Sequence, residues 1–171
     1  MKRFLLIISV VFLSSASLNA QSIKKNEVDK FTGAKIIETS SKTLYSQNSP
    51  LMTGFTHKFD FALRKVNDSI TIVANILMND IVKYTEDNGV IFLLENNDKI
   101  SLKTTYTGIG SDAFANGYYF STVFHLSTED IEKLKKYKIT DVRVTYFGGH
   151  YDKTLSENKR SLMQKMLRLL E

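Results

Sequence analysis

Residues 55–77 read FTHKFDFALRKVNDSITIVANIL, and the fold depends on this stretch more than on any other. Its first half alternates between mainly apolar and mainly polar side chains. The apolar set is Phe55, His57, Phe59, Phe61 and Leu63, and the polar set is Thr56, Lys58, Asp60 and Arg64. This period of two predicts a strand with one buried and one solvated face. Asn67 and Asp68 both tolerate positive φ, so they predict a two-residue hairpin turn before a return strand over 69–77.

Further strands are predicted on either side of this hairpin. Residues 90–95 and 100–106 are apolar runs separated by Asn96, Asn97 and Asp98, which is the pattern of a second hairpin. Residues 35–39, 118–126 and 142–146 have the same strand character. Residues 21–30 are polar and are expected to form a loose lead-in. The Ser-, Asn-, Pro- and Gly-containing stretches 40–54 and 107–117 are expected to be loops.

Two helices are predicted in the C-terminal part of the chain. The first covers about 127–136, because Ser127 can cap a helix and Glu129 and Asp130 favour the positive end of its dipole. The second covers about 155–170, where Leu and Met recur at three- and four-residue spacing. Strand pairs followed by helices predict an α+β domain with a largely antiparallel sheet. A β-sandwich with an appended C-terminal helix is the alternative.

The first twenty residues resemble a secretory signal peptide. Lys2 and Arg3 precede a short apolar run, FLLIISVVFL, and small and polar residues follow up to Ala20. The apolar run is shorter than the roughly 20 residues that a membrane-spanning helix needs. We therefore expect cleavage after Ala20, export to the periplasm or the extracellular space, no transmembrane segment in the mature chain, and a single globular domain over 21–171.

Composition narrows the class of protein. The chain has no Cys, so its stability has to come from apolar burial, to which 11 Phe and 8 Tyr contribute. The net charge is +5, and it falls to +3 without residues 1–20, which hold Lys2 and Arg3 and no acidic residue. Lysines alternate with acids along the chain. This pattern predicts a solvated surface and no nucleic-acid partner.

His150 and Asp152 are the first candidate site residues. They lie in the sequence Gly148-Gly149-His150-Tyr151-Asp152, which is predicted to be a turn between a strand and the last helix. A carboxylate two residues away can orient an imidazole, and such a pair can act as a base or as metal ligands. The alternative is an exposed histidine in an ordinary turn.

Asp112 and Asn116 are the second pair of candidates. They belong to the predicted Gly-rich loop 107–117, whose side-chain and carbonyl oxygens suit a hard cation or a polar ligand. One carboxylate is few for a calcium loop, and the glycine spacing differs from that of a phosphate-binding loop. The alternative is a long hairpin connection. We predict no resident metal, no cofactor and no assigned catalytic residue, because nucleophile-elbow and zinc-protease motifs are absent from the sequence.

Two stretches resemble parts of known exported proteins. The sequence from Asp29 to Gly33, followed by 35–39, resembles the mature start of small exported proteins of Bacteroidetes-type bacteria. The run from Leu126 to Val144 and the signal ending Asn19-Ala20-Gln21 resemble the same group. The resemblance implies a bacterial periplasmic or surface location. The group has no assigned activity, so the resemblance implies no functional residue.

Three function hypotheses follow from the sequence. The first is an exported, non-catalytic module that binds an unknown cell-envelope protein or ligand. The second is a small metal-dependent or hydrolytic enzyme that uses the Gly-Gly-His-Tyr-Asp turn. The third is an assembly role for the apolar last helix, whose basic residues Lys159, Arg160, Lys165 and Arg168 are expected to be solvated.

Overall fold

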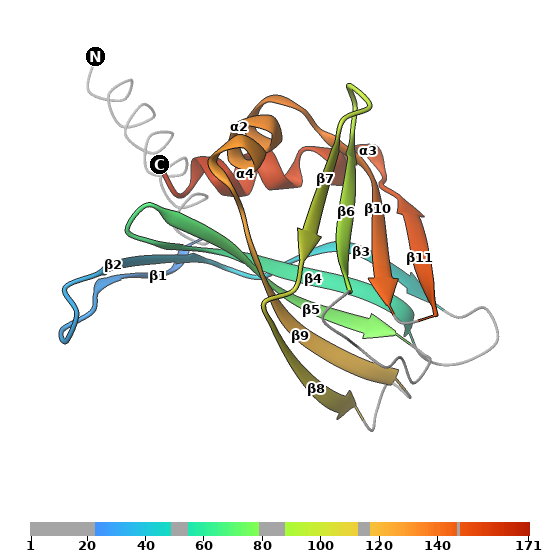
Figure 1. Cartoon of the computed structure of the whole chain (residues 1–171), viewed down its shortest axis with the longest axis horizontal. Coiled ribbons are helices and arrows are strands. Elements are labelled where there is room, and N and C mark those ends of the chain that lie inside the picture. Colours follow the sequence, from blue (N-terminus) through green and yellow to red (C-terminus); the bar gives the residue numbers. More distant parts are fainter. Residues whose placement is uncertain (1–22, 49–54, 79–87, 113–116, 147) are drawn as a thin grey trace, which may run out of the picture.

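The computed structural model describes residues 23–48, 55–78, 88–112, 117–146 and 148–171 (Figure 1). The described strands are β1 (Ile23–Val28), β2 (Lys35–Thr39), β3 (Lys42–Asn48), β4 (Phe55–Val66), β5 (Ser69–Met78), β6 (Gly89–Leu94), β7 (Lys99–Lys103), β8 (Tyr106–Asp112), β9 (Gly117–His125), β10 (Ile139–Tyr146) and β11 (Gly149–Thr154). The described helices are α2 (Thr128–Lys136), α3 (Glu157–Arg160) and α4 (Leu162–Arg168). The predicted α+β class with antiparallel strands is confirmed.

The strands form two sheets. The seven-stranded sheet has the order β1-β2-β4-β5-β9-β8, and β3 is an additional neighbour of β4. The four-stranded sheet has the order β11-β10-β6-β7. The long strand β4 pairs with β3 along its first part and with β2 along its last part. In Figure 1 the four-stranded sheet stands over the β3–β9 part of the larger sheet, while the β1–β2 hairpin projects away from both.

One hydrophobic core lies between the two sheets and the helices. The larger sheet contributes four fully buried rings, Phe59, Phe61, Phe120 and Phe124. The smaller sheet contributes Val90, Phe92, Val142 and Val144. Leu134 of α2 and Met163, Met166 and Leu167 of α4 complete the same cluster. The helices lie beside the four-stranded sheet, above the larger one (Figure 1), so they close a part of the core that the smaller sheet leaves uncovered.

An aromatic contact joins β11 to the larger sheet. The ring of Tyr151 stacks on that of His57, with centroids 3.9 Å apart and an interplanar angle of 8°. The Tyr151 hydroxyl donates a hydrogen bond of 2.6 Å to Oε1 of Gln47 in β3. Partial burial raises the pKa of Tyr151 above its usual value. This contact fixes the position of β11, whose opposite face bears His150 and Asp152.

Both predicted hairpins and the first helix are confirmed. Val66 pairs with Ser69 across the first turn, where Asn67 has a φ of 52°. The second turn has Asn97 at a φ of 68°. Ser127 caps α2: its hydroxyl accepts a hydrogen bond from the Asp130 amide, and the Asp130 carboxylate accepts one from the Ser127 amide.

Two stretches in the first third of the chain that were expected to be irregular contain strands. Residues 23–28, expected to be a loose lead-in, form β1 and pair with β2. This strand is polar and largely exposed, and it is held by backbone hydrogen bonds to β2 rather than by burial of its side chains. Within the turn, the Asp29 carboxylate accepts hydrogen bonds from the amides of Phe31 and Thr32. Part of the expected loop 40–54 is β3, in which Leu44 and Tyr45 are both buried next to an irregularity in the pairing.

The expected helix over 155–170 begins later and is divided. Helix α3 ends at Arg160 and α4 begins at Leu162, because Ser161 between them has a φ of −90° and a ψ of 4°. Leu155 precedes both helices and is buried beside β10, where its amide donates to the Thr140 carbonyl. No helix in the described part of the chain is long and apolar enough to cross a membrane.

Candidate functional site

The stretch Gly148-Gly149-His150-Tyr151-Asp152 was expected to be a turn that leads into a helix. This expectation is wrong. Residues 149–154 form β11, which pairs with β10 in a hairpin. The backbone reverses between Tyr146 and Gly149, and Gly148 has a φ of 88°, which glycine adopts without steric cost. His150 and Asp152 are two residues apart on a strand, so they lie on the same face of the sheet.

Asp152 is held mainly by a residue that the sequence reasoning did not select. Its two carboxylate oxygens accept hydrogen bonds of 2.6 Å from Nε and Nη2 of Arg143, which lies opposite it on β10. His150 Nε2 is 3.8 Å from Oδ2 of Asp152, which is beyond hydrogen-bonding distance. The Arg143 hydrogen bonds lower the pKa of Asp152 below its usual value. The carboxylate is therefore a weak base.

Asp112, the first residue of the second candidate pair, lies in the other sheet. The prediction of a loop over 107–117 is wrong for its first part, because residues 106–112 form β8, which pairs with β9. Asp112 is the last residue of β8 and pairs with Gly117, so it belongs to the seven-stranded sheet. Asn116 lies outside the described residues. Within the described ranges, no group of three His, Cys, Asp or Glu side chains is placed to hold a metal ion.

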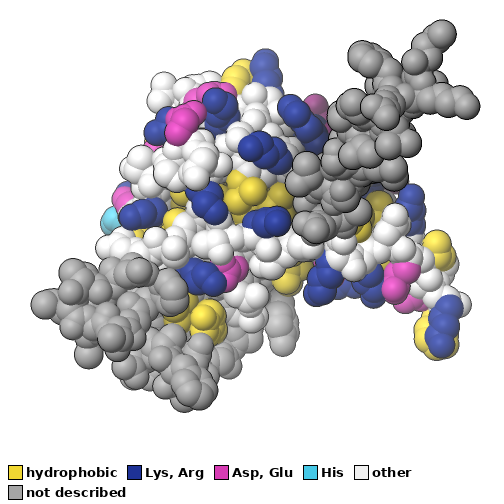
Figure 2. Space-filling view, turned by 180° about the vertical axis from the view of Figure 1, so that it is seen from behind, with side chains coloured by type: hydrophobic (Ala, Val, Ile, Leu, Met, Phe, Trp, Pro, Cys, Tyr) yellow, Lys and Arg dark blue, Asp and Glu magenta, His cyan; other side chains and the backbone are white. Residues whose placement is uncertain are grey.

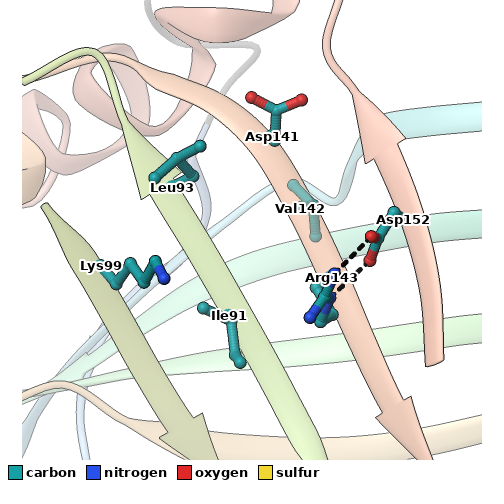
Figure 3. Close-up of a pocket in the computed structure, with 7 residues that line it drawn as sticks. All are labelled: Ile91, Leu93, Lys99, Asp141, Val142, Arg143 and Asp152. Atoms are coloured by element: carbon teal, nitrogen blue, oxygen red, sulfur yellow. Dashed lines mark hydrogen bonds and ion pairs between the residues drawn. The ribbon is translucent and has the colours of Figure 1, made fainter. Parts of the chain in front are cut away.

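A shallow cavity of about 420 Å³ lies on the outer face of the four-stranded sheet (Figure 3). Its lining comes from all four strands: Ile91 and Leu93 of β6, Lys99 of β7, Asp141, Val142 and Arg143 of β10, and Asp152 of β11. Figure 3 shows the Arg143–Asp152 pair on one side of the two apolar residues and Lys99 on the other. Of the predicted site residues, Asp152 lines this cavity.

The strand register explains why these side chains meet. Arg143 lies between Asp152 and Ile91 in one row across the sheet. In the next row Leu93 lies between Asp141 and Lys99. Because alternate residues of a strand share a face, the core-facing Val90 and Phe92 leave Ile91 and Leu93 on the outer face, both partly exposed.

The charges around the cavity are balanced. Lys99 and Arg143 supply two positive charges, and Asp141 and Asp152 supply two negative charges. Asp141 also accepts a hydrogen bond of 2.5 Å from the Thr154 hydroxyl. Arg143 and Asp152 are about half exposed, with side-chain exposures of 45% and 53%. The site therefore has an apolar centre and a solvated polar rim without a strong net charge.

Sequence reasoning missed Ile91, Leu93 and Arg143. The alternation of 142–146 places Arg143 on the polar side of its strand, whereas residues 90–94 read VIFLL and give no signal that separates Ile91 and Leu93 from their buried neighbours. No protein family, curated protein or solved structure matches this chain. Its function is therefore inferred from its own geometry.

Proposed function

We propose that the protein is an exported, non-catalytic binding module of the bacterial periplasm or cell envelope, and that its partner docks on the outer face of the four-stranded sheet. The observation that supports this most directly is the cavity beside Ile91 and Leu93. Two partly exposed apolar side chains surrounded by a polar rim correspond to the usual anatomy of a protein-binding surface.

A polypeptide is the class of partner that suits this surface. Its balanced charges do not favour a strongly charged ligand, because attraction to one pair of rim charges is offset by repulsion from the other. A neighbouring chain can cover the apolar centre and pair with Arg143, Asp141 and Lys99 at the rim. Arg143 is already oriented by Asp152, which reduces the entropy that binding would cost.

The hydrolytic or metal-dependent alternative has less support. It needs His150 and Asp152 to act together, but both oxygens of Asp152 accept hydrogen bonds from Arg143. His150 is exposed on β11, and the cavity lining is formed by other residues. Export is supported by the pattern of the first twenty residues, and the bacterial envelope by the resemblance of 29–39 and 126–144.

The test uses the purified protein and solubilised envelope proteins of its source cell. We expect saturable binding, and we expect Ile91→Asp to weaken it at least tenfold, because a charge in the apolar centre would have to be desolvated. The matched control is Val28→Asp, an equivalent change at an apolar residue that is 64% exposed on the distant β1–β2 hairpin. This control should bind like the wild-type protein.

Circular dichroism and thermal unfolding of both variants would establish that they remain folded. The proposal is wrong if the wild-type protein shows no saturable binding. It is also wrong about the surface if folded Ile91→Asp binds as tightly as the Val28→Asp control.

A further inference from the structure

A second groove lies between helix α4 and the chain around Ser40 and Lys42, where β2 leads into β3. Its volume is about 700 Å³, within the range of roughly 300–1,000 Å³ that small-molecule sites occupy. The lining residues are Ser40, Lys42, Leu162, Lys165, Met166, Arg168 and Leu169. None of them lines the cavity of the four-stranded sheet.

The helical wall of this groove is a continuous stripe. Leu162, Lys165, Met166 and Leu169 are spaced at i, i+3, i+4 and i+7, which places them along one side of α4. Met166 is buried at the base, while Leu162 and Leu169 are partly exposed. The stripe lies next to the core-facing residues Met163 and Leu167, so the apolar surface of α4 extends beyond what the core covers.

The cations at this groove differ from four others near the helices. Lys133, Lys135, Lys138 and Arg160 each lie within 4 Å of a glutamate carboxylate. Lys42, Lys165 and Arg168 are exposed and form no ion pair within the described part of the chain. The described lining residues also include no carboxylate. The groove therefore combines an apolar floor with three positive charges that the described carboxylates leave unneutralised.

Figure 2 shows the molecule from behind. Near the centre of this view a group of apolar side chains reaches the surface, and several Lys and Arg side chains lie around it. Acidic side chains are fewer near this patch. Long basic side chains can keep their charged ends in water while their methylene stems cover apolar surface.

We propose that this groove binds a single-chain anionic amphiphile, meaning an acyl chain that ends in one negatively charged headgroup. The chain lies along Leu162, Met166 and Leu169. The headgroup lies at the rim, where Lys42, Lys165 and Arg168 approach it from both walls. The apolar floor selects for a hydrocarbon chain, and the uncompensated charge selects an anionic headgroup over a cationic one.

The experiment measures binding of dodecanoate to the purified protein by isothermal titration calorimetry, below the concentration at which dodecanoate forms micelles. We expect saturable binding of one dodecanoate per chain. Dodecyltrimethylammonium, which has the same chain length and the opposite charge, should bind at least tenfold more weakly. Acetate, which has the headgroup without the chain, should give no measurable heat.

Charge-reversal variants locate the site. Lys165→Glu and Arg168→Glu should each weaken dodecanoate binding at least tenfold, because both side chains are exposed and their replacement leaves the core intact. The matched control is Lys99→Glu, which reverses an exposed lysine at the other cavity and should leave dodecanoate binding unchanged. Leu169→Asp should also weaken binding, through loss of the apolar floor.

Four results would overturn the proposal. They are no binding of dodecanoate by the wild-type protein, equal binding of the cationic amphiphile, unchanged affinity in folded Lys165→Glu and Arg168→Glu, and binding to anionic phospholipid vesicles without binding of free dodecanoate. The last result would assign the groove to a membrane surface. The partner-binding test on Ile91 uses a different face, so each of the two proposals can fail independently.

Discussion

The inner and outer faces of the four-stranded sheet are formed by alternating residues of the same strands. On β6, Phe92 is completely buried, whereas its neighbours Ile91 and Leu93 are partly exposed. On β10, Val142 and Val144 are buried, whereas Arg143 between them is exposed. A shift of one residue along a strand therefore separates residues that stabilise the fold from residues that are available for binding.

The largest effect on the free energy of unfolding is expected from a substitution at the inner face. Phe92→Ala should lower the free energy of unfolding by about 3–5 kcal/mol, because it removes a fully buried ring and leaves a cavity. Ile91→Ala should cost about 1 kcal/mol, since Ile91 is only partly buried. Urea unfolding of both variants measures the difference. Equal losses would contradict the division between the two faces.

An intermediate effect is expected at Gly89, where the sheet tolerates no side chain. A Cβ atom there would overlap the backbone carbonyl oxygen of Leu102 on β7. Gly89→Ala should therefore lower the free energy of unfolding by about 1–3 kcal/mol, the usual cost of overpacking. Gly149→Ala is the matched control, because its new methyl group would meet the side chain of Tyr146 rather than the backbone. A comparable loss in both variants would show that backbone overlap is not the cause.

The smallest effect on stability is expected at the outer face. The pKa of the Asp152 carboxyl should lie below its usual value of 3.8 because of the Arg143 hydrogen bonds, and Arg143→Gln should raise it toward 3.8. A depressed carboxyl pKa stabilises the folded state above the unfolded-state pKa. That contribution is therefore lost as the pH falls from about 3.8 through the lower folded-state pKa.

Side-chain carboxyl chemical shifts, followed by NMR during an acid titration, measure the Asp152 pKa. Lys99→Gln is the control, because Lys99 lines the same cavity without hydrogen bonding to Asp152. If Arg143→Gln leaves the Asp152 pKa unchanged, the ion pair does not hold this carboxylate in solution.

Elements with a regular pattern and a recognisable turn were predictable. The β4–β5 hairpin follows from alternation and the β6–β7 hairpin from two apolar runs, and each turn has an Asn that accepts positive φ. Helix α2 follows from its Ser127 cap. In each case the signal lies within a few neighbouring residues, where local steric and hydrogen-bonding preferences are strong.

Elements that depend on a distant partner were missed. Strand β3 pairs with β4 through an irregularity that places two consecutive residues, Leu44 and Tyr45, in the core, so its sequence does not alternate. Strand β8 contains Gly108 and Gly110 but lies at a sheet edge with β9 as its neighbour. Glycine weakens a strand without preventing its backbone pairing.

The candidate site was predicted only in part for the same reason. The spacing to His150 pointed to Asp152, but its main partner Arg143 lies nine residues earlier, on the other strand of a hairpin. The sequence had predicted a turn and a helix at the place of that hairpin. Ile91 and Leu93 join the site through strand register. Register depends on which strands pair, and pairing of β6 with β10 connects segments about 50 residues apart.

The sequence by itself determined the α+β class, the antiparallel hairpins, the capped first helix and the absence of disulfides, because these depend on composition and on short-range preferences. Only the tertiary structure decided that the strands divide into two sheets, that Arg143 holds Asp152 beside Ile91, and that Lys42 faces the helical stripe of α4 across a groove. Such contacts join distant segments, and their geometry is set by the packing of one shared core.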